Sequence, residues 1–166
     1  YKEENKLDSA FYVLDQGLAK SPEDIELNQD LGNCLYASAL ISTGNTRDSL
    51  LLLAKEKYQS IIRKQHDYIN ALHGLSSTYL EFGELDSALK YSEMCIRLDS
   101  IKDVIQLNKA DILLRKNQLK ELEIYLIKLD TRFPSNPYIS LDWAQLWVRK
   151  KNLAKAAEYF AKARKA

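Results

Sequence analysis

Apolar residues along this chain recur at steps of three and four positions, and short polar clusters interrupt them at regular intervals. Leu72, Leu75 and Tyr79, for example, follow this spacing, and a break at Gly83 and Glu84 comes next. Steps of three and four residues place side chains on one face of an α-helix. The pattern therefore predicts a succession of amphipathic helices, about nine in all, joined by short turns.

The same pattern repeats at a longer interval of 34 residues. Two series of positions stand 34 apart: Leu51, Leu85, Leu119 and Leu153, and three residues later Ala54, Ala88, Leu122 and Ala156. The preceding copy, at Leu7 and Ala10, stands 44 residues earlier, so that interval contains ten additional residues. A repeat of this length is too short to bury its own apolar face, so neighbouring copies must stack and share a core.

We interpret the chain as one solenoid of five consecutive segments. They are residues 1–24, the second helix of a truncated repeat; 25–68, a repeat with the insertion near 42–51; and three further repeats at 69–102, 103–136 and 137–166. Turns at Phe82-Gly83-Glu84, Lys116-Asn117 and Lys151-Asn152 separate the two helices within a repeat, and the prolines at Phe133 to Pro137 mark the boundary between the last two repeats.

The insertion is predicted to lengthen a helical hairpin. Gly44 and Asn45 form a turn signal, and the residues on both sides favour helix. We expect both helices to gain about one turn, with two or three of the four leucines at 50–53 in the core. The longer hairpin either packs its own tips or projects to bind a partner.

Composition favours an all-α domain without catalytic motifs. The 166 residues are 46% hydrophobic and include only three prolines and five glycines, which are few for the tight turns of an all-β protein. No phosphate-binding, dinucleotide-binding, nucleophile-elbow or HExxH motif occurs. His66, His73, Cys34 and Cys95 show no metal-ligand spacing. We therefore expect no catalytic residues, no metal and no cofactor.

The net charge of +1 conceals an asymmetry along the chain. Residues 1–30 contain eight acidic and three basic side chains, whereas residues 141–166 contain seven basic and two acidic ones. Ends of opposite charge can steer a head-to-tail contact or a neighbouring domain, although solvated helix faces also account for such a pattern.

Several positions in each copy resemble the tetratricopeptide repeat. They are Leu31-Gly32-x2-Leu35 with Ala54-x3-Tyr58; Leu72-x2-Leu75-Ser76-x2-Tyr79 with Ala88; Ala110, Leu113, Leu126 and Pro134; and Trp143-Ala144-x2-Trp147 with Ala156-x3-Phe160. Asn28, Gln106 and Ser140 depart from the pattern where a large aromatic residue is expected. The resemblance covers essentially the whole chain and implies a right-handed superhelix of stacked antiparallel helix pairs.

The resemblance also implies a concave groove, lined by the first helix of each pair, that receives an extended peptide or a partner helix. The candidates that we place in this groove are Asn33, Tyr36, His73, Ser77, Leu80, Asp111, Leu114, Arg115, Gln145, Val148 and Arg149, with Gln29, Leu40, Glu81, Leu107 and Leu141 beside them. Co-chaperones of this family clamp an acidic C-terminus with a fixed Lys, Asn and Arg set. Only Asn33 fits that set here, although Arg115 and Arg149 offer charge to an acidic peptide.

The sequence thus predicts a non-enzymatic scaffold whose partner is a protein or peptide. One alternative is the regulatory or substrate-recruiting domain of a larger enzyme, and another is nucleic-acid binding through the basic C-terminal repeat. The second is opposed by the lack of interleaved groove aromatics and by the acidic N-terminal end.

Three further expectations concern association and location. Phe11, Leu14 and Leu18 lack a preceding partner helix, so we expect them to be partly exposed and to allow self-association through the N-terminal helix. No apolar run is long enough to insert into a membrane. Two unpaired cysteines favour the cytoplasm, with the periplasm as the alternative.

Overall fold

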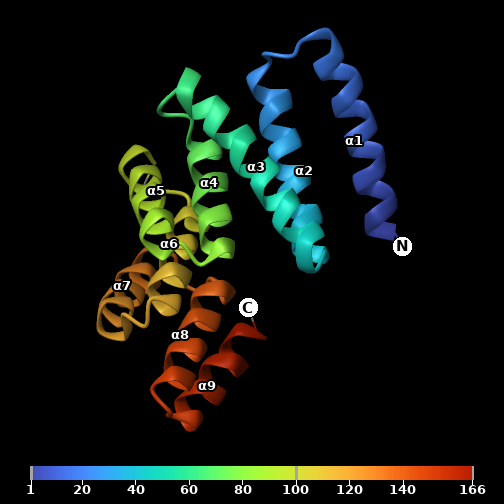
Figure 1. Cartoon of the computed structure of the whole chain (residues 1–166). Helices are drawn as coiled ribbons and strands as arrows, with labels where there is room; N and C mark the ends of the chain where they lie inside the picture. Colours follow the sequence, from blue (N-terminus) through green and yellow to red (C-terminus); the bar gives the residue numbers. More distant parts are fainter. Residues whose placement is uncertain (1, 100, 166) are drawn as a thin grey trace. The chain divides into compact units, whose positions relative to one another are not determined.

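The computed structural model describes the backbone of residues 2–99 and 101–165 and the side chains of residues 9–99 and 101–165. These residues form nine α-helices and no strand, as the sequence predicts (Figure 1). The helices are α1 (Lys2–Lys20), α2 (Ile25–Ile41), α3 (Gly44–Lys64), α4 (Ile69–Phe82), α5 (Leu85–Leu98), α6 (Asp103–Arg115), α7 (Leu119–Arg132), α8 (Pro137–Arg149) and α9 (Leu153–Ala163). The side chain of Leu7 and the segment ends at residues 1 and 166 lie outside the described part.

The chain divides into two compact units, residues 1–94 and 95–166, and each is described by itself. In the first unit α1 packs on α2, α2 on α3 and α3 on α4, and α2 also contacts α4. In the second unit α6 packs on α7, α7 on α8 and α8 on α9, and α6 also contacts α8. Contact between alternate helices is what stacked helix pairs produce, because the first helices of neighbouring pairs lie side by side.

The ten-residue insertion lengthens both helices of its pair. Helix α2 has 17 residues and α3 has 21, whereas α4 and α5 have 14 each. The additional residues are therefore three in α2 and seven in α3, and the connection at 42–43 is as short as the one at 83–84. Our expectation of one extra turn is right for α2 and too small for α3, which gains about two turns.

Only part of the leucine run in α3 enters the core. Leu51 is fully buried and Leu50 is half-buried, whereas Leu52 and Leu53 are 51% and 47% exposed. One face of a helix accommodates about two of four consecutive residues. The other two leave apolar surface on the outside of the long hairpin.

The turns between helices use backbone conformations that the sequence signals. Gly83 ends α4 in the left-handed region with φ 75°, and Asn117 and Lys151 adopt positive φ at the corresponding places in the next two pairs. Ser135, between α7 and α8, also has a positive φ. Glycine and asparagine reach this region readily, and it ends a helix by turning the chain back. Pro137 then begins α8, where its missing N–H is not needed.

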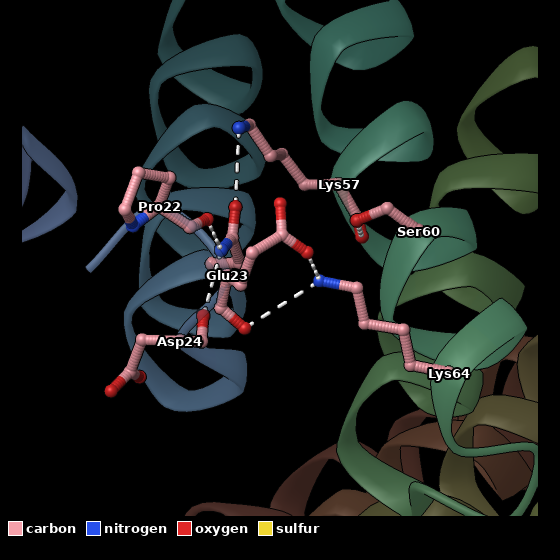
Figure 2. A network of polar contacts seen from close by, with 7 residues as sticks. Pro22, Glu23, Asp24, Lys57, Ser60 and Lys64 are labelled. Carbon is pink, nitrogen blue, oxygen red and sulfur yellow. Dashed lines mark hydrogen bonds and ion pairs between the residues drawn. The ribbon is translucent and has the colours of Figure 1, made fainter.

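A polar network that includes Pro22, Asp24 and Lys57 lies between the start of α2 and the end of α3 (Figure 2), and Asn28 bonds to all three. The Asn28 side chain donates to the backbone carbonyls of Pro22 (2.9 Å) and Asp24 (2.7 Å) and accepts from the Lys57 ammonium (3.2 Å). Asp24 caps α2 by accepting from the Leu27 N–H at 2.9 Å. A buried amide whose groups are all bonded costs little. Asn28 therefore replaces the expected aromatic contact with hydrogen bonds.

A second polar contact secures the same end of α3. Glu23 and Lys64 form an ion pair across the loop that precedes α2 (Figure 2). The hydrogen bond from Lys64 and the charge of its ammonium group lower the pKa of the Glu23 carboxyl group. Gln106 in α6 stands where Asn28 stands in α2, and its buried side chain accepts from the Tyr125 hydroxyl. Asn28 and Gln106 are thus each bonded to the second helix of their own pair.

Tyr58 of α3 packs between α2 and α4, which are the first helices of two consecutive helix pairs. Its side chain is 1% exposed, and its ring lies against Gly32 of α2 and Gly74 of α4. A Cβ atom at Gly32 would lie 2.7 Å from the ring, and one at Gly74 would lie 2.5 Å from it. Both distances are too short for two carbon atoms, so only glycine permits this arrangement.

We predict that Gly74→Ala lowers the free energy of unfolding by about 1–3 kcal/mol, because the added methyl group overlaps the buried Tyr58 ring. Urea denaturation measures the change. Gly17→Ala is the matched control: its Cβ would approach only the flexible end of Leu27, at 3.0 Å. That control should be neutral or stabilising by up to about 1 kcal/mol. A Gly74→Ala protein as stable as the wild type would contradict the close packing.

Candidate peptide-binding site

Within each unit the groove candidates lie on two neighbouring helices, each of which is the first helix of its pair. Helices α2 and α4 carry Asn33, Tyr36, His73, Ser77 and Leu80 in the first unit, and α6 and α8 carry Asp111, Leu114, Arg115, Gln145, Val148 and Arg149 in the second. Since α2 contacts α4 and α6 contacts α8, each unit presents a two-helix face. We call them the α2–α4 face and the α6–α8 face.

Most of the candidates are accessible. Asn33, Arg115, Gln145, Val148 and Arg149 are exposed, and Tyr36, His73, Ser77 and Asp111 are half-buried. Among the neighbouring residues Leu40 is exposed, Glu81, Leu107 and Leu141 are half-buried, and Gln29 is buried. Accessibility is a requirement for ligand contact, and all of these residues except Gln29 meet it.

Leu80 and Leu114 are exceptions that correct the sequence interpretation. Each side chain is only 5% exposed, so neither offers apolar contact to a ligand. Leu114 packs in the core of the second unit with Leu113 and Leu122. Half of the residues in α4 are buried, and Leu80 is one of them. Helices that are packed on two sides leave a narrower free face than the spacing alone indicates.

Asn33 has a side-chain orientation that two buried partners determine. Its carbonyl oxygen accepts from the Tyr58 hydroxyl at 3.0 Å and from the Gln29 amide at 2.9 Å. The amide group is planar, so its NH2 group points away from these donors. Asn33 itself is exposed, which leaves this NH2 group available to an acceptor outside the protein.

The glycine at position 74 explains how Tyr58 reaches Asn33. The Tyr58 ring passes between Gly32 and Gly74, and the hydroxyl then meets the Asn33 side chain. Burial raises the pKa of Tyr58, so its hydroxyl keeps its proton and remains a donor. Sequence reasoning placed Asn33 on the face but missed the contribution of Tyr58. Paired glycines on consecutive first helices, opposite a large residue, were the available signal.

Acidic residues follow the α2 edge of this face. Glu26 and Asp30 are exposed and stand one helical turn apart. Partial burial, followed by the nearby Glu26 carboxylate, raises the pKa of Tyr68 at the start of α4. The α2–α4 face therefore combines a fixed amide donor with a negatively charged edge.

The α6–α8 face contains an unpaired carboxyl group that the sequence projection missed. Asp142 of α8 is largely buried, and its Oδ2 atom has no hydrogen-bond partner. Burial, and then the nearby Asp111 carboxylate, raise the pKa of Asp142 to about 7. An acidic residue directly between two apolar ones, Leu141 and Trp143, was the available signal, since such a residue has few partners there.

The guanidinium group of Arg115 is already engaged by a carboxylate of its own helix. Its Nε atom lies 3.4 Å from Asp111 Oδ2, one turn earlier on α6. The Asp111 carboxylate therefore balances part of the charge of Arg115. The attraction to an acidic peptide that we expected from Arg115 is correspondingly reduced.

We predict that Asp142 makes stability depend on pH. The carboxyl group titrates near 7 in the folded protein and near its ordinary value of 3.8 when unfolded. Between these values only the unfolded state releases the proton, so the free energy of unfolding falls as pH rises from about 4 to 7, by up to about 4 kcal/mol. Above about pH 7 the loss is complete.

Thermal unfolding of Asp142→Asn tests this assignment. The variant keeps a neutral side chain of the same shape, so its advantage in Tm over the wild type should be small at about pH 4 and large at about pH 8. An equal difference in Tm at the two pH values would show that Asp142 ionises freely in the folded state.

Metal-binding and membrane-spanning features are not evident in the described part of the chain. There, no group of three or more His, Cys, Asp or Glu side chains is placed to hold a metal ion. The described helices also include none whose length and apolar character suffice to cross a bilayer.

Solved structures provide the comparison with known proteins. A tetratricopeptide repeat protein, TTC0263 of Thermus thermophilus, superimposes with a TM-score of 0.77 at 18% identity, over 99% of this chain and 84% of that one. MamA matches with a TM-score of 0.73 at 16% identity, over 99% and 90% of the two chains. This chain has the tetratricopeptide repeat fold. No protein-family model matches the sequence, and no curated protein matches it.

A further tetratricopeptide repeat structure bears on binding. YrrB, described as having an unusual peptide-binding site, matches with a TM-score of 0.68 at 16% identity, over 99% of this chain and 79% of that one. The predicted resemblance and the all-α solenoid class of fold are therefore confirmed. At this level of identity the likeness establishes the fold alone.

Proposed function

We propose that this tetratricopeptide repeat chain is a non-catalytic scaffold that binds a peptide or a partner helix on its first-helix faces. The observation that carries the proposal is the Asn33 amide, an exposed donor held in place by Tyr58 and Gln29. A donor fixed before binding costs less conformational entropy when a ligand arrives. The peptide-binding site described for YrrB is consistent with this use of the fold.

The α2–α4 face favours a segment with a backbone carbonyl beside a basic group. The Asn33 amide donates to a carbonyl oxygen, and the exposed carboxylates of Glu26 and Asp30 attract a positive charge. Tyr36 of α2 and Ser77 of α4 add half-buried surface to this face. The alternative of a regulatory domain in a larger enzyme uses the same face and differs only in what is attached to it.

Nucleic-acid binding is not favoured by the basic end of the second unit. Lys150 and Lys155 lie over the Trp147 ring at 5.0 and 4.1 Å, so these two ammonium groups contact an aromatic ring of the protein itself. Lys150 also pairs with Glu123, and Lys162 lies 3.9 Å from Asp130. These ammonium groups are engaged within the protein and are less available to phosphates.

The state of α1 bears on self-association. Leu14 is buried, which corrects the expected exposure, whereas Phe11 and Leu18 are half-buried. The exposed apolar residues of this helix are instead Tyr12 and Val13, at 69% and 66%. Self-association through α1 stays a prediction, and light scattering at rising protein concentration tests it.

Selection of peptides from a random display library tests the proposed function. Peptides that bind the wild-type chain should shift the backbone NMR signals of α2 and α4, with Asn33 and Ser77 among them. Asn33→Ala should weaken their binding about tenfold, because one hydrogen bond to a fixed donor is lost.

Asn45→Ala is the matched control, since it makes the same change at an exposed position at the start of α3. It should leave the affinity unchanged. Selected peptides that bind Asn33→Ala as tightly as the wild type, or that shift only residues away from both first-helix faces, would contradict the proposal.

A further inference from the structure

The first unit contains a cleft that the proposed function does not use. It encloses about 260 Å³ and is lined by Gln59, Ile62 and Arg63 of α3, Leu75 of α4 and Tyr91 of α5. Leu75 stands two residues from His73 and from Ser77, about 200° around the helix from His73. The cleft therefore opens on the opposite side of α4 from the α2–α4 face.

The walls of the cleft are held by packing. The Tyr91 ring stacks on Tyr79 with the ring centroids 5.5 Å apart and the planes 6° from parallel. Gln59 donates to the Tyr79 hydroxyl at 3.4 Å, and Leu75 is 1% exposed. Aromatic pairs in offset stacks resist rotation. The cleft thus has a preformed wall and an apolar floor.

Arg63 supplies a positive charge that no carboxylate balances. Within the described residues its guanidinium group has no ion-pair partner, whereas the next residue, Lys64, pairs with Glu23. The Lys90 ammonium lies 5.6 Å from the centroid of the Tyr91 ring, on the same wall. None of the five lining residues is acidic. The cleft is therefore electropositive.

We propose that this cleft binds a carboxylate on a short aliphatic stem, supplied by a glutamate or aspartate side chain of a partner protein. The planar guanidinium group of Arg63 matches a carboxylate with two parallel hydrogen bonds. Ile62 contacts the stem, and the Gln59 side-chain carbonyl accepts a backbone N–H. The volume is below the roughly 300–1,000 Å³ of small-molecule sites, which fits one side chain.

NMR titration of the ¹⁵N-labelled chain tests the cleft with three probes. They are acetyl-Ala-Ala-Glu-Ala-Ala-amide, the same peptide with Gln in place of Glu, and free glutarate. The Glu peptide should shift the amides of residues 59–63 and of Tyr91, and the Gln peptide should bind at least about fivefold more weakly. Arg63→Gln should weaken the Glu peptide about tenfold.

Arg164→Gln is the control for loss of one positive charge, since Arg164 is exposed at the end of α9, and it should leave binding unchanged. Binding that survives in Arg63→Gln, or the absence of shifts at residues 59–63 for both carboxylate probes, overturns the proposal. Glutarate that binds as tightly as the Glu peptide overturns the assignment to a partner protein. Because Arg63 is exposed, thermal unfolding should show that the variant remains folded.

Discussion

Burial shared between neighbouring helix pairs is the constraint on which this structure depends. A pair of 14-residue helices cannot enclose its own apolar face, so its large side chains must fill gaps in the next pair. Tyr58 shows this most directly, because a residue of one pair is buried against the first helices of two pairs, at Gly32 and Gly74. The same side chain then holds Asn33 by its hydroxyl. Packing and the candidate binding residue are therefore linked through one ring.

Polar groups interrupt this core at identifiable positions. Asn28 and Gln106 are buried and bonded to the second helix of their pair, so hydrogen bonds replace the aromatic residue expected at this position in joining the two helices. Asp142 is different, because its buried oxygen has no partner. An unsatisfied carboxyl group lowers stability, and proteins often retain such groups where a ligand supplies the missing partner. Asp142 and Asn33 thus mark the two faces on which binding is proposed.

Much of the fold was predictable because it follows from spacing. The 34-residue interval and the steps of three and four require only that a side chain be apolar or small. Two sequences can therefore keep the same spacing even when few of their residues are identical. This explains why structures at 16–18% identity share the fold while no family model matches. The lengths of α2 and α3 were less predictable, since both helices can absorb an insertion. The placement of Leu80 and Leu114 failed because a helix packed on two sides buries residues that a one-sided projection exposes.

The candidate site was less predictable than the fold, since it depends on contacts between distant residues. Asn33 was visible as a polar residue of the α2–α4 face, but its fixed orientation requires Tyr58, 25 residues later, and Gly74, 16 beyond that. Arg63 and Tyr91 belong to different repeats and share no motif. Such groups come together only through stacking of the helix pairs.

Native-state hydrogen exchange of the Tyr58→Ala variant tests the central claim most directly. If the Tyr58 ring joins two first helices, its removal should reduce the protection of amides in α2 and α4 together, as well as in α3. Loss of protection confined to α3, with α2 and α4 as protected as in the wild type, would contradict shared burial as the basis of this fold.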